Sequence, residues 1–204
     1  ELVSTTNWQP YTWSVNNVAL AENLNTALAF WQGGNPEAGY KLFESALVES
    51  MYLGASPGGF QQLSFYDAIR GELYRDFADP IGVASRALVE GLFGIQPNLL
   101  EHKLKIKPGF PEDWEYASLN LPDLDVAFKK IGNTTTYTIT NKFKTGMDLE
   151  LELSINSTAI KAVLVNGNSV NYQPFAEAIG KPKILIPAGI HKNYTIQVTT
   201  EGNT

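Results

Sequence analysis

The hydrophobic pattern changes its period near the middle of the chain, and this change constrains the fold more than any other feature. In residues 18–31 and 36–51 apolar residues recur every three or four positions, the spacing of one face of an α-helix. From residue 103 onward apolar and polar residues alternate, as in strands with one buried face. The sequence therefore predicts an α+β fold in two parts, with a helical segment over residues 1–100 and an antiparallel β-sandwich over residues 101–204.

The charge of the chain divides at the same place. Residues 1–100 hold ten acidic and four basic side chains, whereas residues 101–204 hold eleven of each, so the whole net charge of −6 lies in the first half. An acidic chain of this kind is not suited to bind nucleic acid or an anionic membrane surface. The chain also lacks a run of 18 apolar residues, so we expect no membrane insertion.

Local signals place the helix starts and one hairpin. Asn35-Pro36-Glu37 combines a capping residue, proline at the first helical position and an acid near the positive helix end. Asp79-Pro80 repeats this signal, and Asn16 and Asn17 can cap an earlier helix that ends before Gly33.

The second half of the sequence predicts about eight strands. Asn166-Gly167 is a strong signal for a two-residue hairpin turn within this half. Seven of these strands are Lys103–Lys107 and segments 116–121, 124–130, 134–143, 148–154, 160–165 and 193–199.

Several kinds of chemistry are excluded or disfavoured by residue content. There are no cysteines, which removes disulfides, thiolate metal sites and cysteine nucleophiles. The two histidines, His102 and His191, lie in or beside the predicted β half, far from the cluster of aromatic and acidic residues in the first half, which disfavours a Ser-His-Asp triad or a histidine-rich metal site. The sequence has no phosphate-binding glycine loop followed by lysine. We therefore expect neither a metal nor a cofactor.

Aromatic residues gather in the helical half and suit a sugar site. Flat aromatic side chains stack on the apolar face of a sugar ring, and ligand sites commonly combine such rings with a few polar groups. The same residues could instead form the core of a helical packing layer, and both interpretations stay open. The candidate substrate-binding aromatics are Trp8, Tyr11, Trp13, Phe60 and Tyr66.

Acidic residues next to these aromatics could supply the catalytic chemistry. Glycoside hydrolysis needs two carboxyl groups, one that donates a proton and one that activates water or attacks carbon. Asp79 and Asp76 are the candidate catalytic carboxylates, and Arg75 is a candidate hydrogen-bond donor to sugar hydroxyls. A purely structural interpretation is also available, with Asp79 as a helix cap and Arg75 as an ion-pair partner.

Two segments of the chain resemble a known family. The run from Asp79 to Pro97, the run from Leu104 to Trp114 with Pro108 and Pro111, and the β-rich tail are similar to the end of the six-hairpin, (α/α)6 glycoside hydrolases. The bacterial α-L-fucosidase and α-L-rhamnosidase families are nearest in pattern. The resemblance covers residues 13–155, and it is specific only over 79–114. It implies a partial α/α toroid with a sugar site at its inner rim, in which Asp79 or Asp76 serves the general-base system and the general acid lies upstream.

The number of predicted helices limits what this chain can do by itself. Three or four helices cannot close a ring of twelve, so we expect a C-terminal segment of a glycoside hydrolase that acts on poly- or oligosaccharides. Its expected partners are a carbohydrate and an upstream part of the same protein, or another chain, that completes the toroid. We expect no turnover from the chain alone and a periplasmic or secreted bacterial location. The alternative is a non-catalytic carbohydrate-binding or protein-interaction module.

Overall fold

The computed structural model describes residues 1–4, 18–53, 78–155, 159–175 and 181–201. The chain forms two compact units. The helical unit comprises Glu1–Leu92 together with Gly109–Pro111, and the sandwich unit comprises Phe93–Pro108 together with Glu112–Thr204. The fold class is therefore α+β with helices followed by a β-sandwich, as the sequence predicts.

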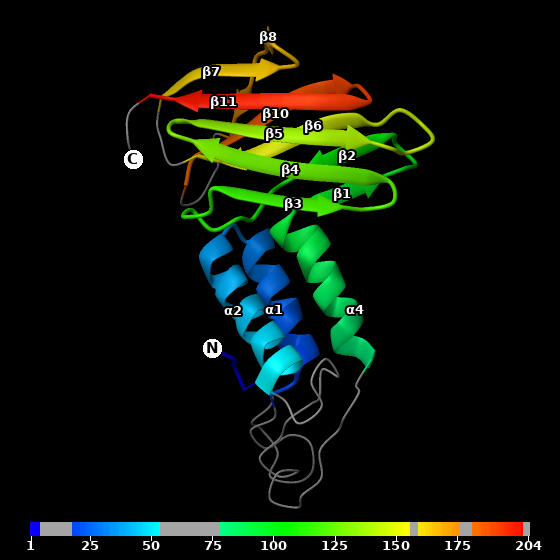
Figure 1. Ribbon diagram of the computed structural model, residues 1–204, viewed down its shortest axis with the longest axis vertical. Helices are drawn as coiled ribbons and strands as arrows, with labels where there is room; N and C mark the ends of the chain where they lie inside the picture. The colour runs from blue at the N-terminus through cyan, green and yellow to red at the C-terminus, as the bar shows by residue number, and fades with distance from the viewer. Residues whose placement is uncertain (5–17, 54–77, 156–158, 176–180, 202–204) are drawn as a thin grey trace, which may run out of the picture. The chain divides into compact units, whose positions relative to one another are not determined.

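The helical unit is built around α1. Figure 1 shows α1, α2 and α4 side by side, and α1 contacts α2, α4 and η3. Two of the helices continue as short π-helices, a local widening that is uncommon in regular helices. The elements are α1 (Leu20–Gln32), α2 (Pro36–Val48), the π-helix η2 (Glu49–Leu53), α4 (Ala78–Arg86) and the π-helix η3 (Ala87–Leu92).

The helices α1 and α2 differ in how their N-termini are capped. The side chain of Asn35 accepts a hydrogen bond from the amide of Ala38 at 3.2 Å, which confirms the predicted start of α2. Asn16 and Asn17 lie outside the described residues, and the N-cap position of α1 is Ala19, which has no capping side chain. The buried Asn23 instead ties Val3 to this turn, because its amide group exchanges two hydrogen bonds with the backbone of Val3 and donates a third to the carbonyl of Ala19.

Trp31, at the end of α1, occupies a pocket made by glycines. Its indole is 5% exposed, meets Phe43 edge-on with ring centroids 5.6 Å apart, and donates from Nε1 to the carbonyl of Gly109 at 2.9 Å. A Cβ atom placed on Gly39 would lie 3.0 Å from Trp31 Cδ2, and one placed on Gly91 or Gly109 would overlap the indole. The pocket therefore requires residues without side chains on three different segments.

The sandwich unit consists of two sheets that lie face to face (Figure 1). One sheet has five strands in the order β1-β2-β6-β10-β9, and the other has six in the order β3-β4-β5-β11-β7-β8. The strands of the five-stranded sheet are β1 (Ile95–Asn98), β2 (Lys103–Ile106), β6 (Asp148–Ser154), β9 (Gln173–Pro174) and β10 (Lys183–Ile190). Those of the six-stranded sheet are β3 (Tyr116–Asn120), β4 (Leu124–Ile131), β5 (Thr134–Asn141), β7 (Ile160–Val165), β8 (Asn168–Ser169) and β11 (Asn193–Thr200).

The sandwich core follows the alternation that the sequence shows. The inner faces bury alternate residues, among them Leu149 and Leu151 on β6 and Ile139 on β5, each with no exposed surface. Asn166 and Gly167 both have positive φ in the β7–β8 turn, as a two-residue turn of type I′ requires, which confirms the predicted hairpin.

The structure corrects two details of the predicted sheet. β10 was not predicted, because Pro187 and Gly189 interrupt its alternation, and its register with β6 shifts between these two residues. The pairing of β2 with β6 is parallel, whereas the sequence predicts an antiparallel sandwich. The remaining strand pairs among the described residues are antiparallel.

We expect Gly91→Ala to lower the free energy of unfolding of the helical unit by about 1–3 kcal/mol, because the new methyl group overlaps the Trp31 indole. Gly82 in α4 is a matched control, since a Cβ there meets nothing within 4 Å. Gly82→Ala should raise stability by about 0.5–1 kcal/mol through the better helix propensity of alanine. Urea unfolding, followed by circular dichroism at the helical wavelength, measures the free energy of unfolding of both variants. Equal stability of the two variants would contradict the packing role of Gly91.

Candidate functional site

Asp79 is the only predicted site residue that falls within the described ranges. It lies in the first turn of α4, and its side chain is exposed. The helix begins at Ala78, so Asp79 lies inside the first turn rather than before the helix as predicted. A carboxylate in this position is accessible from outside the fold.

The other predicted site residues lie outside the described residues. Their grouping around Asp79, and with it the pairing of Asp76 with Asp79, stays a prediction. These residues are Trp8, Tyr11, Trp13, Phe60, Tyr66, Arg75 and Asp76.

One buried carboxylate stands out in the sandwich unit. Glu152 on β6 is 6% exposed, although it lies on the face of the five-stranded sheet that points away from the core. Lys105 Nζ lies 2.6 Å from its Oε2, and Lys107 Nζ lies 3.7 Å from its Oε1. In the described part of the chain, no group of three or more histidine, cysteine, aspartate or glutamate side chains could hold a metal ion.

The electrostatics of this cluster explain why Glu152 is ionised. Burial by itself would raise the pKa of the Glu152 carboxyl, but the hydrogen bond from Lys105 and the charges of Lys105, Lys107 and Lys183 outweigh it, so that the net pKa is lowered. Burial lowers the pKa of Lys107, and the opposing charge of Glu152 only partly offsets this. The cluster is a structural ion-pair network, because the buried carboxylate of Glu152 is paired with both Lys105 and Lys107.

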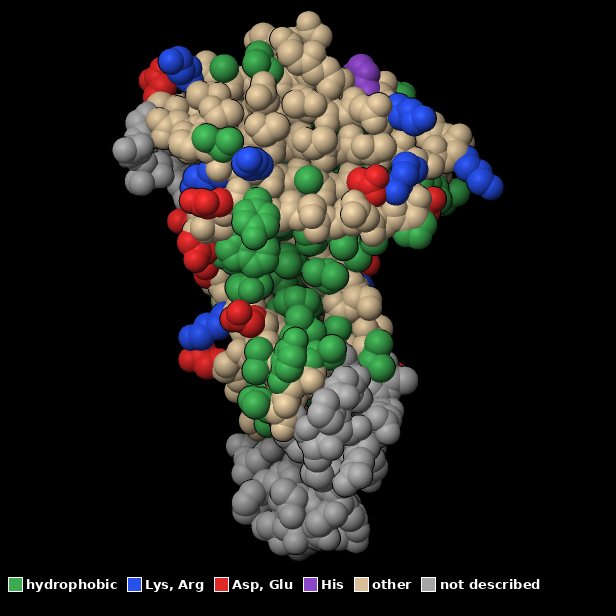
Figure 2. Space-filling view, viewed as in Figure 1, with side chains coloured by type: hydrophobic (Ala, Val, Ile, Leu, Met, Phe, Trp, Pro, Cys, Tyr) green, Lys and Arg blue, Asp and Glu red, His purple; other side chains and the backbone are tan. Residues whose placement is uncertain are grey.

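A hollow of about 660 Å³ lies on the six-stranded sheet. Tyr116 on the edge strand β3 is 77% exposed and lines both this hollow and a second one of about 560 Å³ beside it. Figure 2 shows that the visible face of the sandwich is mostly neither hydrophobic nor charged. The side chains that line the larger hollow include Tyr116, Ser118, Ala127, Thr136, Thr138 and Gln197.

Strand pairing explains how these residues meet. Tyr116 is opposite Lys129, Lys129 is opposite Thr136, and Thr136 is opposite Gln197, so the four form one row across β3, β4, β5 and β11. The neighbouring row holds Ser118, Ala127 and Thr138. Because directly opposite residues share a face, both rows lie on one side of the sheet.

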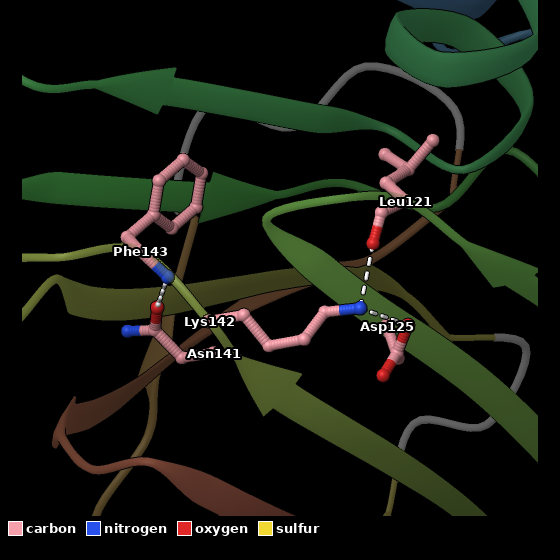
Figure 3. A network of polar contacts seen from close by, with 5 residues as sticks. All are labelled: Leu121, Asp125, Asn141, Lys142 and Phe143. Carbon is pink, nitrogen blue, oxygen red and sulfur yellow. Dashed lines mark hydrogen bonds and ion pairs between the residues drawn. The ribbon is translucent and has the colours of Figure 1, made fainter.

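The carboxylate of Asp125, near the start of β4 on this face, is paired with a lysine. Asp125 lies on the same face of β4 as Ala127 and Lys129, two positions along. Figure 3 shows Lys142 reaching Asp125 at 2.8 Å and the carbonyl of Leu121 at 2.6 Å, while the amide of Phe143 donates to the Asn141 side chain. Among the residues that line the larger hollow, Lys129 is the single charged one.

The sequence did not single out the residues of this hollow. A tyrosine at a strand start and alternate threonines are ordinary features of strands, and only the register brings them together. Conversely, Gly109 and Pro111, within the run that carries the family resemblance, belong to the helical unit, where the Gly109 carbonyl accepts the Trp31 hydrogen bond. That run therefore has a packing role.

Comparison with solved structures finds a similar fold in part of an α-L-rhamnosidase. An α-L-rhamnosidase from Dictyoglumus thermophilum matches 89% of this chain with a TM-score of 0.56 at 13% identity, and the chain spans only 21% of that structure. An α-L-fucosidase from Paenibacillus thiaminolyticus and a family 30 xylanase from Clostridium acetobutylicum match 45% and 42% of the chain. The fucosidase is 9% identical and is matched over 16% of its own length, and the xylanase is 14% identical and is matched over 24%. Their TM-scores of 0.29 and 0.25, respectively, are too low to indicate a shared fold.

The fold is thus similar to a part of a glycosidase. The sequence matches no protein-family model and no curated protein. Within the described ranges, no helix has both the length and the apolar character that a membrane span requires.

We expect Glu152→Gln to destabilise the sandwich unit by about 1–3 kcal/mol near neutral pH, because two lysines lose their charged partner. The pKa of Glu152 is lower in the folded than in the unfolded chain, so its contribution is present above the unfolded value of 4.5 and is lost as the pH falls through the folded value. The difference between wild type and variant should therefore shrink below that pH.

Urea unfolding of the sandwich unit, measured at neutral and at acidic pH, tests this. Glu150→Gln is the matched control, since Glu150 lies two residues earlier on the same face of β6, is half-buried, and should change stability little. A loss for Glu152→Gln that persists unchanged in acid would show that its charge is not the cause.

Proposed function

We propose that this chain is the C-terminal part of a six-hairpin glycoside hydrolase that cleaves glycosidic bonds in poly- or oligosaccharides. The observation that carries the proposal is the arrangement of helices followed by a β-sandwich, which aligns over 89% of the chain with part of an α-L-rhamnosidase. The resemblance of residues 79–114 to the fucosidase and rhamnosidase families supports the same class.

The helices of this chain would form an arc of the catalytic toroid. The three α-helices that the structure describes, with their π-helical extensions, cannot close a ring, and large apolar side chains on them are exposed. Such side chains are suited to pack against further helices, supplied by an upstream part of the protein or by another chain. They include Phe30 (40% exposed), Tyr52 (77%), Leu53 (69%) and Ile81 (47%).

The catalytic role would rest on Asp79 and Asp76. An exposed carboxylate in the first turn of α4 can face a substrate held at the rim of the toroid, where it would act as a general base. The general acid would come from the missing part, so the chain alone should not turn over substrate. We place the complete protein in the bacterial periplasm or outside the cell, where polysaccharides are met.

The complete protein should hydrolyse at least one member of a panel of nitrophenyl glycosides that includes the α-L-rhamnoside and the α-L-fucoside, whereas the 204-residue chain should hydrolyse none. In the complete protein Asp79→Asn or Asp76→Asn should lower kcat by about 10²–10⁴-fold, because a general base is lost. Release of nitrophenol, read by absorbance, gives both results.

Asp123→Asn is the control, since Asp123 is an exposed carboxylate of the sandwich unit. Full activity of both Asp76→Asn and Asp79→Asn would remove the site assignment. A complete protein that binds glycans and cleaves none would favour the non-catalytic alternative.

A further inference from the structure

The hollow around Tyr116 has the chemical character of a sugar-binding surface. We propose that the outer face of β3, β4, β5 and β11 binds a neutral oligosaccharide, with Tyr116 as the stacking platform and Thr136, Thr138 and Gln197 as hydrogen-bonding groups. This site lies in the sandwich unit and is separate from the carboxylates proposed for catalysis.

The shape of the hollow supports a stacked ring. Tyr116 is 77% exposed, and the next row of the same face carries the small side chains of Ser118 and Ala127. These small residues leave room beside the tyrosine, whose side chain is largely accessible. A phenol ring presented in this way can cover the apolar face of a sugar, whose edge then points to the row of polar groups.

The polar groups of the face match the hydroxyls of a sugar. Threonine hydroxyls and the glutamine amide both donate and accept hydrogen bonds, as sugar hydroxyls do. Threonine is β-branched, and these threonines lie in paired strands, so each side chain has few rotamers. This lowers the entropic cost of binding. Within the described part of the chain, the side chains of Tyr116, Thr138 and Gln197 form no hydrogen bond or ion pair with other residues.

The threonines of β5, taken alone, would be explained by the high strand propensity of threonine. Thr134, farther along β5, illustrates this, because its hydroxyl lies 3.0 Å from that of Thr199 on β11 and is satisfied within the protein. What indicates a ligand surface is the combination of an exposed tyrosine with two small residues beside it and an amide in line with it, rather than any one of these residues. The row from Tyr116 to Gln197 crosses four strands, a span of about 14 Å at the usual strand spacing, which is the scale of a short oligosaccharide.

The charge of the face selects a neutral ligand. Lys129 is the single charged side chain among the residues that line the larger hollow, and Asp125 on the same face is paired with Lys142. A surface for nucleic acid or for an acidic polysaccharide would need several cations that are not already paired. Lys129 can instead donate to sugar hydroxyls from its place between Tyr116 and Thr136.

The test uses native affinity electrophoresis of the full 204-residue chain in gels that contain mixed-linkage β-glucan, arabinoxylan, galactan or, as an acidic comparison, polygalacturonate. At least one neutral polymer should retard the chain. Titration calorimetry with an oligosaccharide of the retarding polymer should then show affinity about tenfold weaker for Tyr116→Ala, because the stacking surface is lost. Gln197→Leu, which keeps the size and removes the amide, should also weaken binding.

Tyr172→Ala is the matched control, because Tyr172 is a 38% exposed tyrosine of the same unit that lines neither hollow. It should bind as the unchanged chain does, and circular dichroism should show that all variants keep the strand signal. Retardation by polygalacturonate alone, by none of the polymers, or equally for Tyr116→Ala and the unchanged chain would overturn the proposal. Because binding is measured without turnover, the result is independent of whether the complete protein is a hydrolase.

Discussion

The indole of Trp31 organises the helical unit, and the other elements of that unit are shaped to receive it. Its ring is enclosed by Phe43 of α2, by Gly91 of η3 and by Gly109, which follows the β1–β2 hairpin in the sequence. The hydrogen bond from its Nε1 to the Gly109 carbonyl satisfies the one polar atom of a buried ring. A side chain at Gly91 or Gly109 would displace the indole, so glycine at these positions and tryptophan at 31 depend on one another.

The two outer faces of the sandwich show how one architecture can carry different surface chemistry. On the five-stranded sheet Lys105 and Lys107 both pair with the buried carboxylate of Glu152. On the six-stranded sheet the row from Tyr116 to Gln197 carries one cation and mostly uncharged polar groups. The first face is stabilised by ion pairs that leave little capacity for a ligand, whereas the second holds polar groups that a neutral ligand can engage.

The sequence predicted those parts of the fold that local patterns determine. Asn35 and Pro36 mark the start of α2, and Asn166 and Gly167 mark a hairpin, because capping and turn geometry depend on a few adjacent residues. The parallel pairing of β2 with β6 and the strand β10 were missed, since pairing partners are distant in sequence and Pro187 hides the alternation. The hollow at Tyr116 depends wholly on register, and no spacing along one strand could reveal it.

The two proposed activities place different demands on the fold, and this explains how one chain could bind a glycan without cleaving it. A binding face needs only four strands that are hydrogen-bonded to one another, and β3, β4, β5 and β11 all belong to the sandwich unit. Hydrolysis needs two carboxyl groups held at a fixed separation around one sugar, and in the proposed function the general acid would lie upstream of this chain. Ile81, two residues after Asp79 in α4, is 47% exposed. Further helices packed against Ile81 would fix the position of Asp79 relative to a substrate. Fold similarity supports the scaffold for both activities, whereas each activity rests on its own residues: Asp76 and Asp79 for cleavage, and the row that starts at Tyr116 for binding.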